Sequence, residues 1–158
     1  MSTDQSRLDV IALYSRVLNA WNVRSGSSFA AQFTENASVI GFDGSQMEGR
    51  AAIAEEIGRI FADHRPAAFV AKVREVRSLG ANVTLLRAVA GMLPPDESNL
   101  KPSRNAIQSL VAVMEEGVLK IALFQNTPAR FDGRPQLVEQ LTAELTVVLR
   151  SGRVVDAG

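Results

Sequence analysis

Three long apolar runs in the second half of the chain constrain the fold more than any other feature. They cover residues 83–93, 106–114 and 119–127, and their length and composition are typical of β-strands. Short turns or one polar loop separate such runs, so we expect antiparallel hairpins within a single sheet. Any helices must then pack on that sheet, which predicts an α+β fold.

Polar side chains interrupt these apolar runs: Arg87 in the first, Gln108 in the second, and Gln125 and Asn126 in the third. Burying a polar group without a partner costs roughly 2–7 kcal/mol, so such groups bond one another or line a cavity. Alternation puts Gln125 and Asn126 on opposite faces of their strand, so at most one faces the interior. The alternative is that both amides satisfy backbone groups before Pro128. The pattern favours a small-molecule pocket with a polar floor.

Helical periodicity dominates the first half of the chain. Ser6 and Asp9 fit a capping box ahead of a helix that runs to about Asn22. Ser25-Gly26-Ser27-Ser28 is typical of a turn and N-cap before a short helical piece around residues 29–33, and a third helical pattern covers 49–64. Between them, residues 37–42 are typical of a strand, and Asp43 of the tight turn that follows it.

The second half continues with strands over 68–79, 83–93, 104–114 and 118–127, with a hairpin turn at Glu116-Gly117 and a polar loop at 94–102. Pro135 opens a final helix. We expect one domain over residues 1–150 and a frayed, disordered tail over 151–158. A curved antiparallel or mixed sheet wrapped on the N-terminal helices leaves a cone-shaped pocket at its wide end.

Composition excludes several classes of function. The chain has 158 residues with 17 basic and 17 acidic side chains, which argues against nucleic acid or an anionic membrane as the main partner. Its N-terminus lacks the plan of a signal peptide, so we expect a cytoplasmic protein. With no cysteine and one histidine, it cannot form a disulfide or a multi-histidine metal site. We expect no metal and no cofactor.

Six short segments carry a resemblance to the nuclear-transport-factor-2-like (NTF2-like, cystatin-like) superfamily, and within it to the SnoaL-like group and its SgcJ/EcaC branch. They are FTENA at 33–37, FDG at 42–44, GR at 49–50, FADH at 61–64, LRA at 86–88 and FQNT at 124–127. The resemblance covers residues 8–145. It implies a homodimer with a cone-shaped cavity, acting on a polyketide-derived intermediate of enediyne antibiotic biosynthesis.

The sequence departs from the enzymes of that superfamily. A proton-shuttling isomerase needs a carboxylate base in its cavity, but the cores of the last three strands carry no Asp or Glu. Gly41 and Phe42 stand where a steroid-isomerase relative would carry its base. An epoxide-hydrolase relative would use an aspartate–arginine–aspartate set, and only the arginine has a counterpart here. Both reactions are therefore disfavoured.

Two residues remain candidates for catalysis. His64 is the one side chain expected to titrate near pH 7, and it is either a general acid or base or a helix-end histidine that bonds a carbonyl. Tyr14 carries the chain's single phenol. The candidate ligand-binding residues are Trp21, Phe42, Asp43, Arg87, Gln108, Gln125 and Asn126. For Arg87 the alternative is a structural ion pair with Glu75, for Asp43 a turn residue, and for Trp21 a core position.

The leading hypothesis is an accessory enzyme of polyketide maturation, cyclase-like or isomerase-like, that orients a hydrophobic intermediate in a dry pocket. The alternative is a non-catalytic carrier that holds or protects a labile intermediate, and the missing carboxylate pair favours this second hypothesis. A third possibility is an interaction domain whose pocket is filled by its own side chains.

Overall fold

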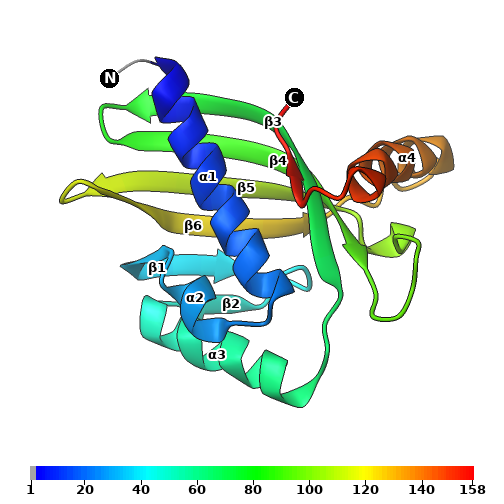
Figure 1. Ribbon diagram of the computed structural model, residues 1–158, viewed down its shortest axis with the longest axis horizontal. Helices are drawn as coiled ribbons and strands as arrows, with labels where there is room; N and C mark the ends of the chain where they lie inside the picture. The colour runs from blue at the N-terminus through cyan, green and yellow to red at the C-terminus, as the bar shows by residue number, and fades with distance from the viewer. Residues whose placement is uncertain (1–2) are drawn as a thin grey trace.

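The computed structural model describes residues 3–158, and the first half of the chain is mainly helical, as the periodicity predicts (Figure 1). Its elements are α1 (Thr3–Asn22), α2 (Gly26–Ala30), β1 (Phe33–Ile40), β2 (Gln46–Glu48) and α3 (Arg50–Asp63). Among the described residues, no helix is both long and apolar enough to cross a membrane.

The second half forms the long strands. They are β3 (Ala68–Gly80), β4 (Val83–Leu93), β5 (Ala106–Glu115) and β6 (Val118–Pro128), followed by α4 (Pro135–Ser151) and β7 (Val155–Asp156); a single 3₁₀ turn, η1 (Pro102–Arg104), precedes β5. The predicted hairpin turn between β5 and β6 is present, with positive φ at Glu116 (50°) and Gly117 (78°). Two consecutive positive φ values match the twist of a two-residue hairpin.

All strands belong to one seven-stranded sheet in the order β2-β1-β6-β5-β4-β3-β7. β3 to β6 form consecutive antiparallel hairpins, whereas β1 pairs with β6, and β7 with β3, in parallel. The predicted fold class, an α+β fold with a curved mixed sheet covered by helices, is confirmed. Figure 1 shows α1 crossing the strands and α4 lying apart from it, beside the bent ends of β3 and β4.

Side-chain alternation along the strands divides the apolar residues into two cores. Leu86, Ala88 and Leu110 belong to the core that the sheet shares with α1, whereas Val89 packs with Leu145 in the smaller core under α4. Because neighbouring residues of a strand point to opposite faces, the sheet is apolar on both sides where helices cover it. We call the α1 side the concave face and the α4 side the convex face.

Several predicted element boundaries are wrong, and β1 spans Phe33–Ile40 instead of the predicted 37–42. α1 already includes Thr3, so Ser6 lies within the helix and is not its N-cap. α2 begins three residues earlier than expected, at Gly26, because Ser25 caps it by accepting a hydrogen bond from the Ser28 backbone N–H at 3.2 Å. Phe33 therefore starts β1 rather than ending a helix.

The predicted disordered tail at 151–158 is also wrong. Gly152 ends α4 in the left-handed conformation (φ 80°), and the Ala71 N–H then donates to the Val154 carbonyl at 2.8 Å as β7 joins the edge of β3. Val154 and Val155 pack against the α1 core, and Arg7 of α1 donates to the Ala157 carbonyl at 3.1 Å. These few apolar residues are too short a pattern to predict a strand.

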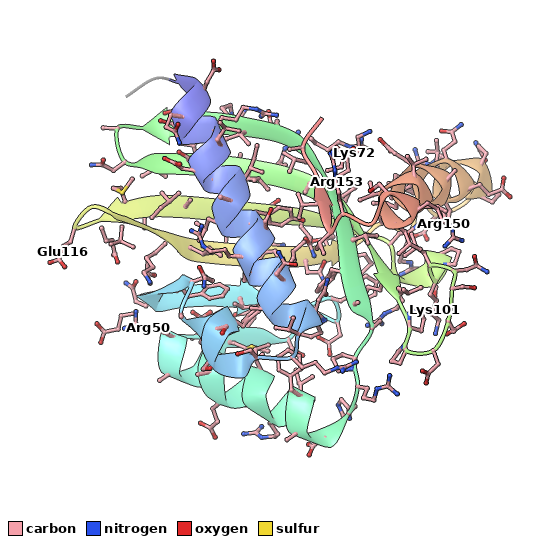
Figure 2. All side chains as sticks on the ribbon, in the orientation of Figure 1. Arg50, Lys72, Lys101, Glu116, Arg150 and Arg153 are labelled. Carbon is pink, nitrogen blue, oxygen red and sulfur yellow. The ribbon has the colours of Figure 1, made fainter. Side chains whose placement is uncertain are left out.

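The polar loop at 94–102 is attached to α4. One Arg150 guanidinium donates to the Ser98 carbonyl at 2.8 Å and to Asn99 Oδ1 at 3.0 Å. Figure 2 labels Arg150 on α4, Lys101 on the neighbouring loop, and Glu116 at the far tip of the β5–β6 hairpin. The loop leads into η1, so α4 helps to place the segment that reaches the pocket described next.

Candidate ligand-binding pocket

A pocket of about 400 Å³ lies at the end of the sheet where β1 and β6 finish and β3 and β5 begin. This volume is within the range of small-molecule sites. Its apolar walls come from α1, α2, α3 and five strands: Trp21, Phe29, Val39, Met47, Ile57, Ile60, Phe69, Met92 and Phe124.

Trp21, at the end of α1, is a fixed part of the wall. Its indole N–H donates to the Ala67 carbonyl at 2.8 Å, and its ring meets Phe61 edge-on with 5.2 Å between centroids. The next residue, Asn22, exchanges two hydrogen bonds with the Phe69 backbone, at 2.8 and 3.0 Å. These contacts hold the end of α1 against the start of β3, so the aromatic wall is preformed.

The polar floor consists of Gln108 on β5 and Asn126 on β6, which are paired across the two strands. Gln108 Nε2 donates to Asn126 Oδ1 at 3.2 Å, and the Tyr14 hydroxyl of α1 donates to Gln108 Oε1 at 2.5 Å. Tyr14 and Gln108 are fully buried. Gln108 and Asn126 line the pocket, whereas Tyr14 lies behind Gln108.

The remaining polar residues stand at the rim of the pocket. The Arg104 guanidinium, from η1, lies over the Phe42 ring at 4.5 Å from its centroid, a cation–π contact between the two sides of the opening. Asp43 accepts a hydrogen bond from the Ser45 backbone N–H at 2.9 Å. Hydrogen bonding by the Ser45 side chain and backbone lowers the pKa of the Asp43 carboxyl, and the charge of Arg104 acts in the same direction.

Five of the nine residues predicted for the site line the pocket: Trp21, Phe42, Asp43, Gln108 and Asn126. Tyr14 touches it only through Gln108. His64, Arg87 and Gln125 lie outside it.

His64 does not lie on the apolar face of its helix. α3 ends at Asp63, and His64 follows in an extended conformation (φ −149°) with an exposed side chain. Arg87 points from the convex face, where its Nε donates to Glu75 Oε1 at 2.7 Å; about half of its side chain (52%) is exposed. This is the ion pair that the sequence offered as the alternative to a ligand contact.

Gln125 pairs with Ser109, one position away from the Gln108–Asn126 pair. Alternation therefore turns it to the convex face. Of the two adjacent amides, only Asn126 lines the pocket. This agrees with the prediction that at most one of the two faces the interior.

The prediction from the sequence omitted the other lining residues, among them Arg104, Met47 and Glu56. Glu56 precedes Ile57 and lies one turn from Ile60 on α3, so the helical spacing of those isoleucines could have placed it near the pocket. Arg104 enters from a 3₁₀ turn, and no periodicity in the sequence indicates it.

The pocket is equipped for hydrogen bonding rather than for proton transfer. Its floor is made of amides, which do not titrate near pH 7. Burial raises the pKa of the Tyr14 phenol, so this group keeps its proton. The two lining carboxylates are at the rim: the Asp43 side chain is exposed, and Glu56 pairs with Arg59 at 3.0 Å. Across residues 3–158, no cluster of three or more His, Cys, Asp or Glu side chains could hold a metal ion.

Comparison with known proteins defines the fold. No protein-family model matches the chain, and no curated protein matches its sequence. Among solved structures, it is similar to a domain of unknown function with a cystatin-like fold from Nostoc punctiforme (TM-score 0.75, 23% identity, 96% of this chain and 97% of that chain).

Two further structures agree. One is an NTF2-like protein of unknown function from Shewanella oneidensis (TM-score 0.65, 11% identity, 77% of this chain and 98% of that chain). The other is a ketosteroid isomerase-like protein from Erwinia carotovora atroseptica (TM-score 0.61, 14% identity, 77% and 95%). The chain thus has the NTF2-like, cystatin-like fold.

Proposed function

We propose that the protein binds a mostly apolar small molecule in this pocket and holds it without acid–base catalysis. The observation that supports this best is the floor itself, whose polar groups are neutral amides and include no general base. The predicted catalytic residues do not change this: His64 is exposed outside the pocket, and the Tyr14 hydroxyl donates a hydrogen bond to Gln108. The geometry favours the carrier over the accessory enzyme.

The class of ligand comes from the resemblance of the sequence. The segment FQNT, which resembles the SgcJ/EcaC branch, makes a polyketide-derived compound of an enediyne pathway the first ligand to test. The pocket supports this choice by its size, about 400 Å³, and by its aromatic and aliphatic walls.

The test is capture of such compounds from an extract, followed by mass spectrometry of the bound and released material. Ile60→Trp should fill the pocket and abolish capture, because Ile60 lines it. Val147→Trp is the matched control, since Val147 is 70% exposed on α4, and should capture as the wild type does. Release of an unchanged compound supports a carrier, and release of a compound with altered mass would establish the accessory enzyme instead. Equal capture by both variants would refute the pocket as the binding site.

We propose further that two copies pair through the convex face. Leu85, Val111 and Leu123 are aligned across β4, β5 and β6 and stay half-buried outside the cover of α4. An apolar stripe on a sheet face is a common site of association. Light scattering should give twice the monomer mass of 17.0 kDa, and Val111→Asp should return the monomer. A wild-type monomer at all concentrations would refute the dimer.

A further inference from the structure

The hydrogen bonds of the pocket floor run in one direction. Tyr14, which is fully buried, has Gln108 Oε1 as its hydrogen-bond acceptor. A phenol can donate or accept, but a buried O–H without an acceptor is costly, whereas an oxygen that accepts nothing costs less. The Tyr14 hydroxyl therefore donates, and this fixes the Gln108 amide with its oxygen toward α1.

That orientation determines what Gln108 and Asn126 can offer. The Gln108 nitrogen turns toward β6 and donates to Asn126 Oδ1 at 3.2 Å. The Asn126 oxygen thereby accepts one hydrogen bond inside the floor, and its nitrogen makes no hydrogen bond to any described residue. Among residues 3–158, Asn105 Oδ1 is the one fully buried side-chain polar atom without a hydrogen-bond partner. The Asn126 nitrogen also lacks a partner, so it is not fully buried. Because Asn126 lines the pocket, its nitrogen faces the accessible space there.

We propose that Asn126 presents its amide N–H to the ligand, so that the pocket selects apolar molecules whose polar atom is a hydrogen-bond acceptor, such as a ketone. Tyr14 is the positioning residue for this preference, because it sets the direction of the hydrogen bonds through Gln108 to Asn126 without touching the ligand. This inference rests on the proposed function, since it names the class of ligand that the same pocket takes.

The opposite arrangement shows why Tyr14 decides the preference. If the Gln108 amide were reversed, its nitrogen would face Tyr14 and its oxygen would accept from Asn126, leaving the Asn126 oxygen to receive a donor from the ligand. The Tyr14 O–H would then have no acceptor in a fully buried site. Removing that hydroxyl makes both arrangements available, and an alcohol can then donate to Asn126.

The experiment compares three probes of one skeleton, namely 1-tetralone, 1-tetralol and tetralin. Their dissociation constants are measured by calorimetry or by fluorescence of Trp21, the single tryptophan, which lines the pocket. The wild type should bind the ketone roughly tenfold more tightly than the alcohol. Tyr14→Phe should bring this ratio close to one, and Asn126→Asp, which replaces the donor by an acceptor, should favour the alcohol.

The outcomes separate this inference from the proposed function. Binding of tetralin together with equal affinities for the ketone and the alcohol would overturn the inference and leave the apolar pocket in place. An unchanged ketone preference in Tyr14→Phe would overturn the role of Tyr14. Failure of the wild type to bind any of the three would overturn the proposed function and the inference with it. Asn126→Asp changes only the pocket-facing end of the Tyr14–Gln108–Asn126 hydrogen-bond series, so it supplies the test if Tyr14→Phe does not fold.

Discussion

The concave and convex faces of the same strands carry different kinds of polar residues. Gln108 of β5 pairs with Ala88, and its neighbour Ser109 pairs with Arg87, so these polar positions differ by a single residue along the strands. On the concave face, Gln108 is fully buried in a chain of neutral hydrogen bonds. On the convex face, Arg87 and Glu75 form an ion pair that remains in contact with solvent.

The difference follows from desolvation. Moving a charge out of water costs more free energy than moving an amide out of water. The enclosed face therefore carries neutral polar groups, and the open face carries the charged ones. A polar residue in an apolar strand is therefore a pocket residue or a surface residue according to its position in the alternation. Four substitutions test this contrast, in order of decreasing effect.

The largest effect is expected where α4 covers the convex face. Leu145 is fully buried there, and it approaches so closely that a Cβ at Gly91 would lie 3.2 Å from its Cδ1. Leu145→Ala should lower the free energy of unfolding by about 2–5 kcal/mol, measured by urea titration. Val147→Ala, on the exposed side of the same helix, should change it little. Equal losses for the two variants would mean that α4 does not pack on the sheet.

On the concave face, Gln108→Leu should cost about 1–3 kcal/mol, because it leaves the Tyr14 hydroxyl buried without an acceptor. The double variant Tyr14→Phe/Gln108→Leu should recover part of this loss, since no polar group is then stranded at this position. Urea titrations of the four proteins complete the cycle. Additive losses in the double variant would contradict a coupled chain.

Arg87→Met should cost less than about 1 kcal/mol, as expected for an exposed ion pair. Thermal unfolding at matched protein concentrations measures it. A cost of several kcal/mol would show that Arg87 is enclosed in solution, which is the result expected if a second copy covered this part of the convex face.

The smallest effect concerns acid stability. Two hydrogen bonds from Arg74, at 2.5 and 2.7 Å, lower the pKa of Glu144 from its ordinary 4.5. A lowered carboxyl pKa contributes stability that is present above 4.5 and is lost as the pH falls through the lower folded value. Glu144→Gln should remove this part of the acid dependence, by about 1 kcal/mol or less. Melting curves between pH 7 and pH 2.5 test it, and identical pH profiles for the two proteins would count against the pair.

The sequence predicted most of the fold because the long strands carry strong patterns. The bounds of β4, 83–93, are confirmed at both ends, and those of β3 and β6 to within one residue. The errors lie at short elements such as α2 and β7, where one cap or one backbone pairing outweighs the local pattern. β7 depends on β3, which is distant in sequence, so nothing local could indicate it.

The site was less predictable for a related reason. Alternation states which residues share a face, but not which face is concave, so Gln108 and Arg87 were equal candidates. The prediction for His64 placed it inside the helix, but α3 ends one residue before it. A difference of one residue at a helix end changes the direction in which a side chain points. Arg104 depends on η1, whose position is set by tertiary contacts.

The pairing of β7 also bears on how the molecule avoids self-association through its sheet edges. An unpaired edge strand offers a row of backbone donors and acceptors to any other extended chain. β7 occupies that row at Ala71 and Lys72 of β3, a bulge interrupts β3 just beyond it, between Val73 and Glu75, and the opposite edge is β2, with three residues. β7 thus covers two positions of the β3 edge, the bulge interrupts the edge beyond them, and β2 ends the sheet on the other side; each of these features limits pairing with another extended chain.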